Sequence, residues 1–415
     1  MSVTSNGVYI SIGIPAFITP ETLDTETVTA AVAADFVDDG NSFIEFITSS
    51  PGGNHLWTRE SAEAPFTRAS TGGPAGASSL AAGDMDADGD VDLVSAGSQG
   101  FGYLENDGGS FSYTQLLSGS AGALCISDLD NNGTLDAAVF SGSQGSVFSS
   151  SIYFDGSSVV HQFTGGLTGP AAAGVAALEC ADTDADGIAE LITGDDDKIT
   201  VYRRENDSYT PYQIITEVGA VTAISAADID ADGVADILAS IASGELLFYK
   251  GTGTTGGSTA IETPPADQTT VANIETLAAG DIDNDADYDL IAGTSGARDR
   301  ILSYDNTGGQ FDEETAAQVF DTSADKALLL FDAENDGDLD ILTSIEAGED
   351  YGASVMYNNT ADADRGNTLL AIPQLEPSEF FATITHAGET AFSWSDFVTS
   401  SPPIHAFYLL EIDWQ

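Results

Sequence analysis

Basic residues are scarce in this chain of 415 residues, which has 10 Lys and Arg against 67 Asp and Glu and a formal net charge of −57. This balance excludes binding to nucleic acid or to an anionic membrane by general electrostatic attraction. Two cysteines are too few for a disulfide scaffold. No apolar run approaches the ~18 residues of a membrane span, and the first residues lack the basic and apolar regions of a secretory signal. Because 42% of the residues are hydrophobic, the chain is not a disordered acidic tail.

The acidic loops alone do not account for the excess of Asp and Glu over Lys and Arg. Six acidic loops, described below, hold 26 of the 67 acids, so the others still outnumber the bases fourfold. Lysine is almost absent, whereas Ala, Gly, Thr and Ser are abundant. Self-repulsion of this size strains a compact fold at low salt, but at molar salt the Debye length is about 3 Å and the repulsion is screened. The composition resembles that of proteins from extremely halophilic organisms.

One pattern recurs along the chain: a run of small apolar residues, an Asp-rich loop and a second apolar run. A degraded copy of the loop begins at Asp35, and intact copies follow at spacings of 44 to 54 residues, beginning at Asp84, Asp128, Asp182, Asp228, Asp281 and Asp332. Fixed periods of about 40–50 residues with strand patterns are typical of β-propellers. The sequence therefore predicts seven units, each forming one blade.

Each unit is expected to contribute four short strands. In the second and fifth units the expected strands are 77–83, 91–96, 100–105, 111–117, 221–227, 234–240 and 245–249. The innermost strand consists of small residues, which suit strands that crowd around a central channel. No long apolar period of 3.6 residues occurs, so little helix is expected. The predicted fold class is all-β, a seven-bladed β-propeller.

Three regions are expected. Residues 1–27 include a strand at 8–14 and close the ring by adding an outer strand to the last blade. Residues 28–372 form the propeller. Residues 373–415 form a β-rich tail with strand-like segments at 380–386 and 407–413. Two interpretations of the tail stay open: a docking element, or a cap over one face.

The loop consensus is Asp-x-Asp-x-Asp/Asn-Gly-x-x-Asp. Carboxylates at positions 1, 3, 5 and 9 and a carbonyl at position 7 offer the oxygens that Ca²⁺ prefers. Glycine at position 6 permits the sharp turn. An EF-hand begins in the same way, but it needs an acid at position 12 and flanking helices. Here position 12 is Ser, Val, Thr or Ala and the flanks have strand patterns, which excludes an EF-hand.

These loops, repeated at blade spacing, resemble the FG-GAP/VCBS-type repeats of integrin-α-like β-propellers over about residues 28–372. The resemblance implies that each loop joins the first and second strands of a blade and holds one structural Ca²⁺, about six ions in all. Carried over by loop position, the implied ligands are Asp84, Asp86, Asp88, Asp90, Asp92; Asp128, Asp130, Asn132, Thr134, Asp136; Asp182, Asp184, Asp186, Ile188, Glu190; Asp228, Asp230, Asp232, Val234, Asp236; Asp281, Asp283, Asp285, Asp287, Asp289; and Asp332, Glu334, Asp336, Asp338, Asp340.

Three loops depart from the pattern. The sixth has Ala286 where glycine is expected, and the seventh has the longer Glu334 at position 3. The first has Val37 and Phe43 at ligand positions, so no metal is expected there. The FG and GAP motifs themselves are poorly kept, which favours the VCBS type. For every loop, an acidic turn without metal is the alternative.

The search for a catalytic constellation finds none, so the chain is not expected to be an enzyme. The four histidines fall in unrelated parts of the pattern, and neither a Gly-x-Ser-x-Gly elbow nor a phosphate loop occurs. Cys125 and Cys180 stand three and two residues before loop aspartates, and we interpret them as buried small hydrophobes rather than a nucleophile or a bridge. We interpret Arg203 and Arg204 as members of surface ion pairs.

The favoured hypothesis is a recognition or adhesion module for a protein or glycan receptor on a cell surface. Extracellular calcium modules have dissociation constants of about 10⁻⁴–10⁻³ M, so such sites fill only outside the cell. This fits poorly with the lack of a secretory signal in the first residues. A virion protein reconciles the two, because it assembles inside the host and meets external Ca²⁺ after release. We therefore expect a spike protein on the virion surface of a virus of halophilic archaea, oligomeric, with the tail docking to other virion proteins. The alternatives are a haloarchaeal cell-surface adhesin and a secreted polysaccharide lyase or hydrolase.

Overall fold

The structure is a computed structural model. It describes residues 21–24, 28–37, 40, 43–61, 64–141, 144–154, 159–171, 175–205, 208–216, 218–253, 261–263, 265, 267–270, 274–282, 288–294, 300–304, 306, 311, 317–320, 328–333, 337, 339–344 and 354–357. All the strands below lie in one compact unit, Phe17–Ile282 with Ala286–Asn359. The predicted strand at 8–14 and the tail at 373–415 fall outside the described residues.

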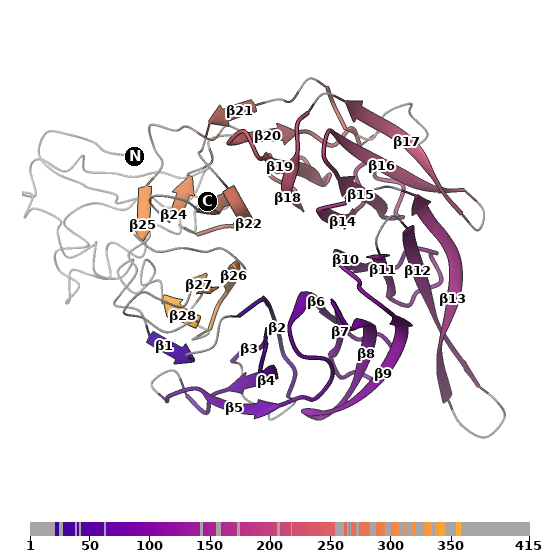
Figure 1. Ribbon diagram of the computed structural model, residues 1–415, viewed down its shortest axis with the longest axis vertical. Coiled ribbons are helices and arrows are strands. Elements are labelled where there is room, and N and C mark those ends of the chain that lie inside the picture. Colours follow the sequence, from indigo (N-terminus) through magenta and orange to yellow (C-terminus); the bar gives the residue numbers. More distant parts are fainter. Residues whose placement is uncertain are drawn as a thin grey trace, which may run out of the picture. The chain divides into compact units, whose positions relative to one another are not determined.

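The described residues contain strands and no helix, so none of them offers a helix that could span a membrane. Five sheets have four antiparallel strands each (Figure 1). In sheet order they are β2 (Ala30–Ala34), β3 (Glu45–Ser50), β4 (Gly53–Thr58), β5 (Thr67–Ser70); β6 (Ala77–Gly83), β7 (Asp92–Gly97), β8 (Gly100–Asp107), β9 (Ser110–Ser118); β18 (Val221–Ala227), β19 (Asp236–Ile241), β20 (Glu245–Tyr249), β21 (Asp267–Thr270); β22 (Ile274–Gly280), β23 (Asp289–Thr294), β24 (Arg300–Tyr304), β25 (Ala317–Phe320); and β26 (Leu328–Phe331), β27 (Asp340–Ser344), β28 (Ser354–Tyr357), β1 (Glu21–Asp24).

The third and fourth repeat units share a single eight-stranded sheet. Its two halves meet where β13 pairs with β17 in parallel through one bridge, Thr168 to Ser208. The sheet contains, in order, β10 (Leu124–Ser127), β11 (Asp136–Ser141), β12 (Gln144–Phe154), β13 (Val159–Ala171), β17 (Ser208–Thr216), β16 (Lys198–Glu205), β15 (Glu190–Gly194) and β14 (Ala177–Ala181).

The prediction of seven separate four-stranded blades is therefore wrong, because the described strands form five such blades. The cause is the length of the third unit's outer hairpin. Its strands β12 and β13 have 11 and 13 residues, and β13 reaches the outermost strand of the fourth unit. Repeat spacing in the sequence does not report this additional pairing.

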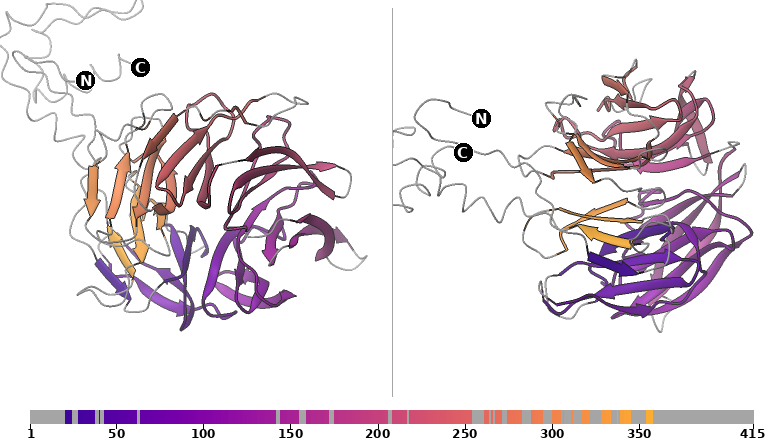
Figure 2. Two further views of the ribbon diagram at one scale, coloured as in Figure 1. Left: turned by 45° about the horizontal axis from the view of Figure 1, so that its top comes forward. Right: turned by 60° about the vertical axis from the view of Figure 1, so that its left-hand side comes forward.

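Within the unit, the first strand of each repeat contacts the first strand of the next. The order of contact is β2, β6, β10, β14, β18, β22 and β26, and β26 contacts β2 in turn. Figures 1 and 2 show these strands following one another around the centre. The last sheet is completed by β1, which pairs with β28, so the N-terminal segment supplies its outer strand. The arrangement is that of a β-propeller.

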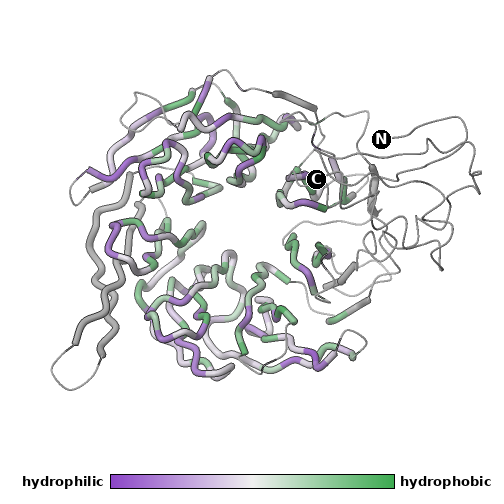
Figure 3. The backbone as a smooth tube through the Cα atoms, turned by 180° about the vertical axis from the view of Figure 1, so that it is seen from behind, coloured by the Kyte–Doolittle hydropathy of each residue, from purple (hydrophilic) through white to green (hydrophobic). Residues whose placement is uncertain are grey.

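The core lies between neighbouring sheets. Second strands such as β7 and β19 are buried along their whole length, whereas the small residues of the inner strands are half-buried. Hydrophobic stretches alternate with hydrophilic turns along the backbone in Figure 3. Gly83 ends β6 against the next unit, since a Cβ there would lie 2.5 Å from Leu135 Cδ1. Close contact of this kind explains the small residues of the inner strands.

Cys125 on β10 and Cys180 on β14 form a disulfide, with their Cα atoms 5.8 Å apart. The interpretation of both as unpaired small hydrophobes is therefore wrong. They stand on the inner strands of consecutive units, and β10 contacts β14. The two cysteines lie close together because of how the third and fourth units pack. The spacing of the cysteines along the chain does not reveal this packing.

Candidate metal centre

The acidic loop of the second unit is held by its own carboxylates. Asp84, at position 1, accepts a hydrogen bond from the Gly89 N–H at 3.2 Å. Asp88, at position 5, accepts one from the Asp90 N–H at 2.9 Å. Ala87 and Gly89 adopt left-handed backbone conformations, with φ of 55° and 104°. The aspartates and the glycine therefore fold the chain into a tight turn between the first and second strands.

This loop geometry repeats in the other units. The glycine at position 6 donates to the position-1 carboxylate in five loops: Gly89 to Asp84, Gly133 to Asp128, Gly187 to Asp182, Gly233 to Asp228 and Gly337 to Asp332. Position 4 also has positive φ, at Ala87, Asn131, Ala185 and Ala231. Sequence reasoning anticipated the glycine but missed position 4, because alanine rarely adopts this conformation.

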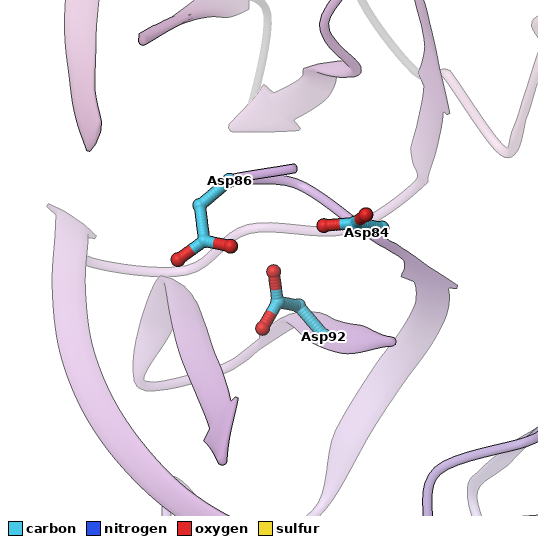
Figure 4. Close-up of side chains that lie close together, drawn as sticks. All are labelled: Asp84, Asp86 and Asp92. Atoms are coloured by element: carbon cyan, nitrogen blue, oxygen red, sulfur yellow. The ribbon is translucent and has the colours of Figure 1, made fainter. Parts of the chain in front are cut away.

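Four clusters of three carboxylates form at positions 1, 3 and 9. In each cluster the three groups place one oxygen within 4.8 Å of each other. Figure 4 shows the first cluster, in which Asp84, Asp86 and Asp92 converge. The clusters are Asp84, Asp86, Asp92; Asp128, Asp130, Asp136; Asp182, Asp184, Glu190; and Asp228, Asp230, Asp236.

The position-5 aspartates Asp88, Asp186 and Asp232 are not among the clustered carboxylates. In the same four loops the position-5 side-chain oxygen accepts a hydrogen bond from the N–H of position 7 at 2.8–2.9 Å; the acceptors are Asp88, Asn132, Asp186 and Asp232. Position 5 therefore shapes the turn. The position-7 residues of these loops are Asp90, Thr134, Ile188 and Val234.

The sixth loop is described only at its ends, and the seventh only at its ends and at Gly337. Ile282 N–H donates to Asp289 at 3.1 Å, and Ala333 N–H donates to Asp340 at 2.8 Å. Asp281 and Asp332 stand at the loop starts. The remaining implied ligands fall outside the described residues: Asp283, Asp285, Asp287, Glu334, Asp336 and Asp338.

The acid at position 9 is buried and hydrogen-bonded to the fold. Asp92 accepts from the Met85 N–H at 3.0 Å, the Tyr103 hydroxyl at 3.0 Å and the Asn106 N–H at 2.8 Å. The bond from position 2 to position 9 occurs in all seven units at 2.8–3.1 Å, with acceptors Glu45, Asp92, Asp136, Glu190, Asp236, Asp289 and Asp340. Position 9 therefore joins the loop to the second strand in every unit.

Glu45 is the first unit's position-9 acid, and sequence reasoning missed it. It begins β3, is 2% exposed, and accepts the Phe36 N–H at 2.9 Å and the Val37 N–H at 3.3 Å. The first loop is two residues longer than the others, so the fixed spacing placed Phe43 at this position. The sequence signal that could have identified Glu45 is an acidic residue at the start of a buried strand.

Four of the clustered carboxylates have raised pKa values. Burial raises the pKa of Asp92 and of Glu190 to about 7. Burial, followed by the charge of Asp88, raises the pKa of Asp86 to about 6. Burial likewise raises the pKa of Asp236 to about 6. Asp84 Oδ1 and Asp230 Oδ1 are buried and accept no hydrogen bond. Since the donors are oxygens, these clusters fit a hard divalent cation.

Among the described residues, ion pairs join three basic side chains to the clusters. Arg203 forms ion pairs with Asp184 and, at 3.9 Å, with Glu190. Arg204 lies 3.9 Å from Asp130 in the preceding unit. Lys250 pairs with Asp230. The arginines therefore do form ion pairs as expected, but their partners are loop carboxylates, and Asp184 is completely buried.

A second contact links five of the loops to the next unit. The carbonyl at position 2 accepts a hydrogen bond from a residue at or just beyond the loop-facing end of the next unit's third strand. Asn106 Nδ2 donates to Phe36 at 2.9 Å, and Asn306 Nδ2 donates to Ile229 at 2.7 Å. Arg204 donates to Leu129 at 3.2 Å, Thr252 N–H donates to Thr183 at 3.1 Å, and Arg59 donates to Ala333. The acidic loops thus contribute to the junctions between units.

Comparison with known proteins supports this repeat. Residues 182–239, from the fourth loop through the fifth and into β19, match the model of the FG-GAP-like repeat family. No curated protein sequence matches the chain.

Among solved structures, BBS1N in complex with ARL6DN, soaked with mercury, is similar with a TM-score of 0.55 at 11% identity, over 84% of this chain and 98% of that one. The same complex soaked with lead gives 0.53 at 11% identity, over 83% and 96%. A lectin of Agrocybe aegerita that recognises non-reducing terminal N-acetylglucosamine gives 0.47 at 16% identity, over 72% and 81%. The similarity to BBS1N supports the β-propeller fold.

Proposed function

We propose that this chain is a calcium-stabilised β-propeller that recognises a partner at a surface and catalyses no reaction. The observation that supports the calcium most is the repeated cluster of three carboxylates, each with oxygens within 4.8 Å of one another. A single catalytic centre needs one such constellation. Repetition in consecutive units instead fits ions that stabilise the scaffold.

The ion neutralises carboxylates that the fold brings together. In the second unit Asp84, Asp86 and Asp92 hold it, and the buried Asp84 Oδ1 accepts no hydrogen bond from the protein. Binding fixes the loop, and in the third, fourth and fifth units it also fixes the position-2 carbonyl that accepts a hydrogen bond from the next unit, at Leu129, Thr183 and Ile229. Calcium in one loop therefore stabilises both its own unit and the following junction.

The recognition role rests on the scaffold and on charge. BBS1N, which shares the fold, was crystallised in complex with ARL6DN. A net charge of −57 suits a salt-rich medium, where repulsion is screened. The proposed setting is the virion surface of a virus of halophilic archaea, with the chain as an oligomeric spike that binds a protein or glycan receptor.

Thermal unfolding with and without calcium tests the scaffold role. Ca²⁺ at millimolar concentration, compared with EDTA, should raise the unfolding temperature by several degrees, because ligand binding to the folded state alone stabilises it. Mg²⁺, which demands a tighter octahedral site, should stabilise less. Equal unfolding temperatures in Ca²⁺ and EDTA contradict the calcium role.

Locating the native protein tests the setting. Purified virions and envelopes of uninfected host cells are probed with an antibody to this chain. Signal on virions, with loss of host attachment after chelation of Ca²⁺, supports the spike. Signal only on uninfected envelopes contradicts it and favours a cell-surface adhesin. Soluble protein in the medium alone favours the secreted enzyme.

A further inference from the structure

Two of the chain's ten basic residues occupy the same register position in consecutive units. The residue after the position-9 acid pairs with a tyrosine in both units: Leu191 with Tyr202, and Ile237 with Tyr249. The residue that follows this tyrosine is Arg203 in the fourth unit and Lys250 in the fifth. In the second unit Leu93 pairs with Leu104, so the equivalent residue is Glu105.

Both cations contact the position-3 carboxylate of their own loop. Lys250 pairs with Asp230, whose side chain is only 10% exposed. Arg203 pairs with Asp184, whose side chain is completely buried, and lies 3.9 Å from Glu190. A solvated surface pair would involve exposed carboxylates. In these two units the positive charge instead lies against the carboxylate cluster of the acidic loop.

The second unit has the opposite charge at this position. Glu105 is exposed, and its charge helps to raise the pKa of Asp86. Within the described part of the chain, no lysine or arginine forms an ion pair with Asp84, Asp86 or Asp92. The third unit lies between these cases, since Arg204 approaches Asp130 only to 3.9 Å and also donates to the Leu129 carbonyl.

We propose that Lys250 and Arg203 are built-in counter-ions that compete with a divalent cation for the fifth and fourth clusters, leaving the second cluster with the highest divalent affinity. This inference rests on the proposed function, because it assumes that the loops bind such a cation. Lys250 pairs with Oδ2 of Asp230, a carboxylate that the ion would also bind, and two positive charges a few ångströms apart repel each other. When calcium is scarce, Arg203 and Lys250 therefore still neutralise part of the carboxylate charge of the fourth and fifth clusters. The second cluster keeps its full negative charge under the same conditions.

Calcium titration of the full chain by calorimetry at low ionic strength tests the inference. The variants are Lys250→Met and Arg203→Met, which keep the apolar stem and remove the charge. The matched control is Lys198→Met, which changes the net charge equally but removes a cation that pairs with Asp195, outside the clusters. The converse variant is Glu105→Lys, at an exposed position of the second unit.

Lys250→Met and Arg203→Met are each expected to tighten one calcium site by about tenfold, a value discounted for the solvent screening of partly exposed side chains. Lys198→Met leaves the affinities near those of the wild type. Glu105→Lys weakens the tightest site by a similar factor, and because it lies on the surface it preserves the fold. High salt should reduce all these differences.

The outcomes separate the two claims. If the wild type binds calcium but Lys250→Met and Arg203→Met behave like Lys198→Met, the counter-ion inference is overturned and the proposed function stands. If Glu105→Lys leaves the tightest site unchanged, the ranking of the second cluster is overturned. If neither the wild type nor the Lys250→Met, Arg203→Met double variant binds calcium, both claims are overturned.

Discussion

The guanidinium of Arg59, in the first repeat unit, donates a hydrogen bond to the carbonyl of Ala333 in the seventh acidic loop. Arg59 is 5% exposed and lies over the Phe66 ring, with its Cζ atom 4.7 Å from the ring centroid. Asn106 and Asn306 make the equivalent contact between other units. The first and last units are thus joined by the same contact as the units within the chain.

Arg59→Met should therefore destabilise the fold, because the contact between the first and seventh units loses its donor. A buried carbonyl without a partner costs about 2 kcal/mol. Urea unfolding measures the loss. Arg68→Met is the control, since Arg68 is exposed and its Cζ atom lies over the Trp57 ring, 5.9 Å from the ring centroid. Equal stability of the two variants would show that Arg59 does not close the ring.

Glu45 and Asp92 separate the structural role of position 9 from its metal role. Both acids accept the position-2 N–H, but only Asp92 belongs to a three-carboxylate cluster among the described residues. Glu45→Gln and Asp92→Asn should each lower the free energy of unfolding by about 1–2 kcal/mol in EDTA. In calcium, Asp92→Asn should also lose part of the added stability, whereas Glu45→Gln should keep it. Unfolding curves in both conditions give this comparison, and identical calcium responses would argue against a metal at the second loop.

Stability without calcium should fall as the pH rises from about 4 to about 7. Burial raises the folded-state pKa of Asp92 and Glu190 to about 7, above the ordinary unfolded values. In that window the folded state holds protons that the unfolded state has released, so raising the pH favours unfolding. With calcium bound the carboxylates are ionised, so calcium should stabilise more at pH 7 than at pH 5. Unfolding temperatures across this range, in calcium and in EDTA, measure both trends; stability in EDTA that rises with pH would contradict them.

Reduction should weaken the junction between the third and fourth units. The Cys125–Cys180 bond closes a loop with a sequence separation of 55 residues. Removing it by Cys125→Ala with Cys180→Ala should cost about 2–4 kcal/mol. Thiol counting under denaturing conditions shows whether the bond exists, and urea unfolding with and without reductant measures its contribution. Two free thiols in the untreated protein would disprove the pairing.

The strands were predictable where pattern and turn agree. The expected strands at 77–83 and 221–227 match β6 and β18, because their runs of small and apolar residues end at the acidic loops. The expected strand at 245–249 matches β20, a short apolar run. The hydrogen-bonded turns of these loops follow from the spacing of Asp and Gly. Thr168 and Ser208 could not be paired in advance, since the merged sheet depends on how far one hairpin extends.

The site was predictable in its residue types but not in its partners. In four loops the carboxylates at positions 1, 3 and 9 lie together, whereas Asp88 and its equivalents accept hydrogen bonds from the backbone. Glu45 was missed because two inserted residues shift it in the spacing. The partners of Arg203 and Lys250 depend on strand register, which brings a third strand over a loop about 20 residues away in the sequence.

The most direct test of calcium in these loops is a crystal structure of the full chain grown with Ca²⁺, with anomalous differences recorded at long wavelength. A peak coordinated by Asp84, Asp86 and Asp92 is expected, with oxygens at about 2.3–2.6 Å. The other described clusters should show peaks of lower occupancy where Arg203 or Lys250 stays in place. Well-ordered loops without a peak at any described cluster would contradict the calcium role.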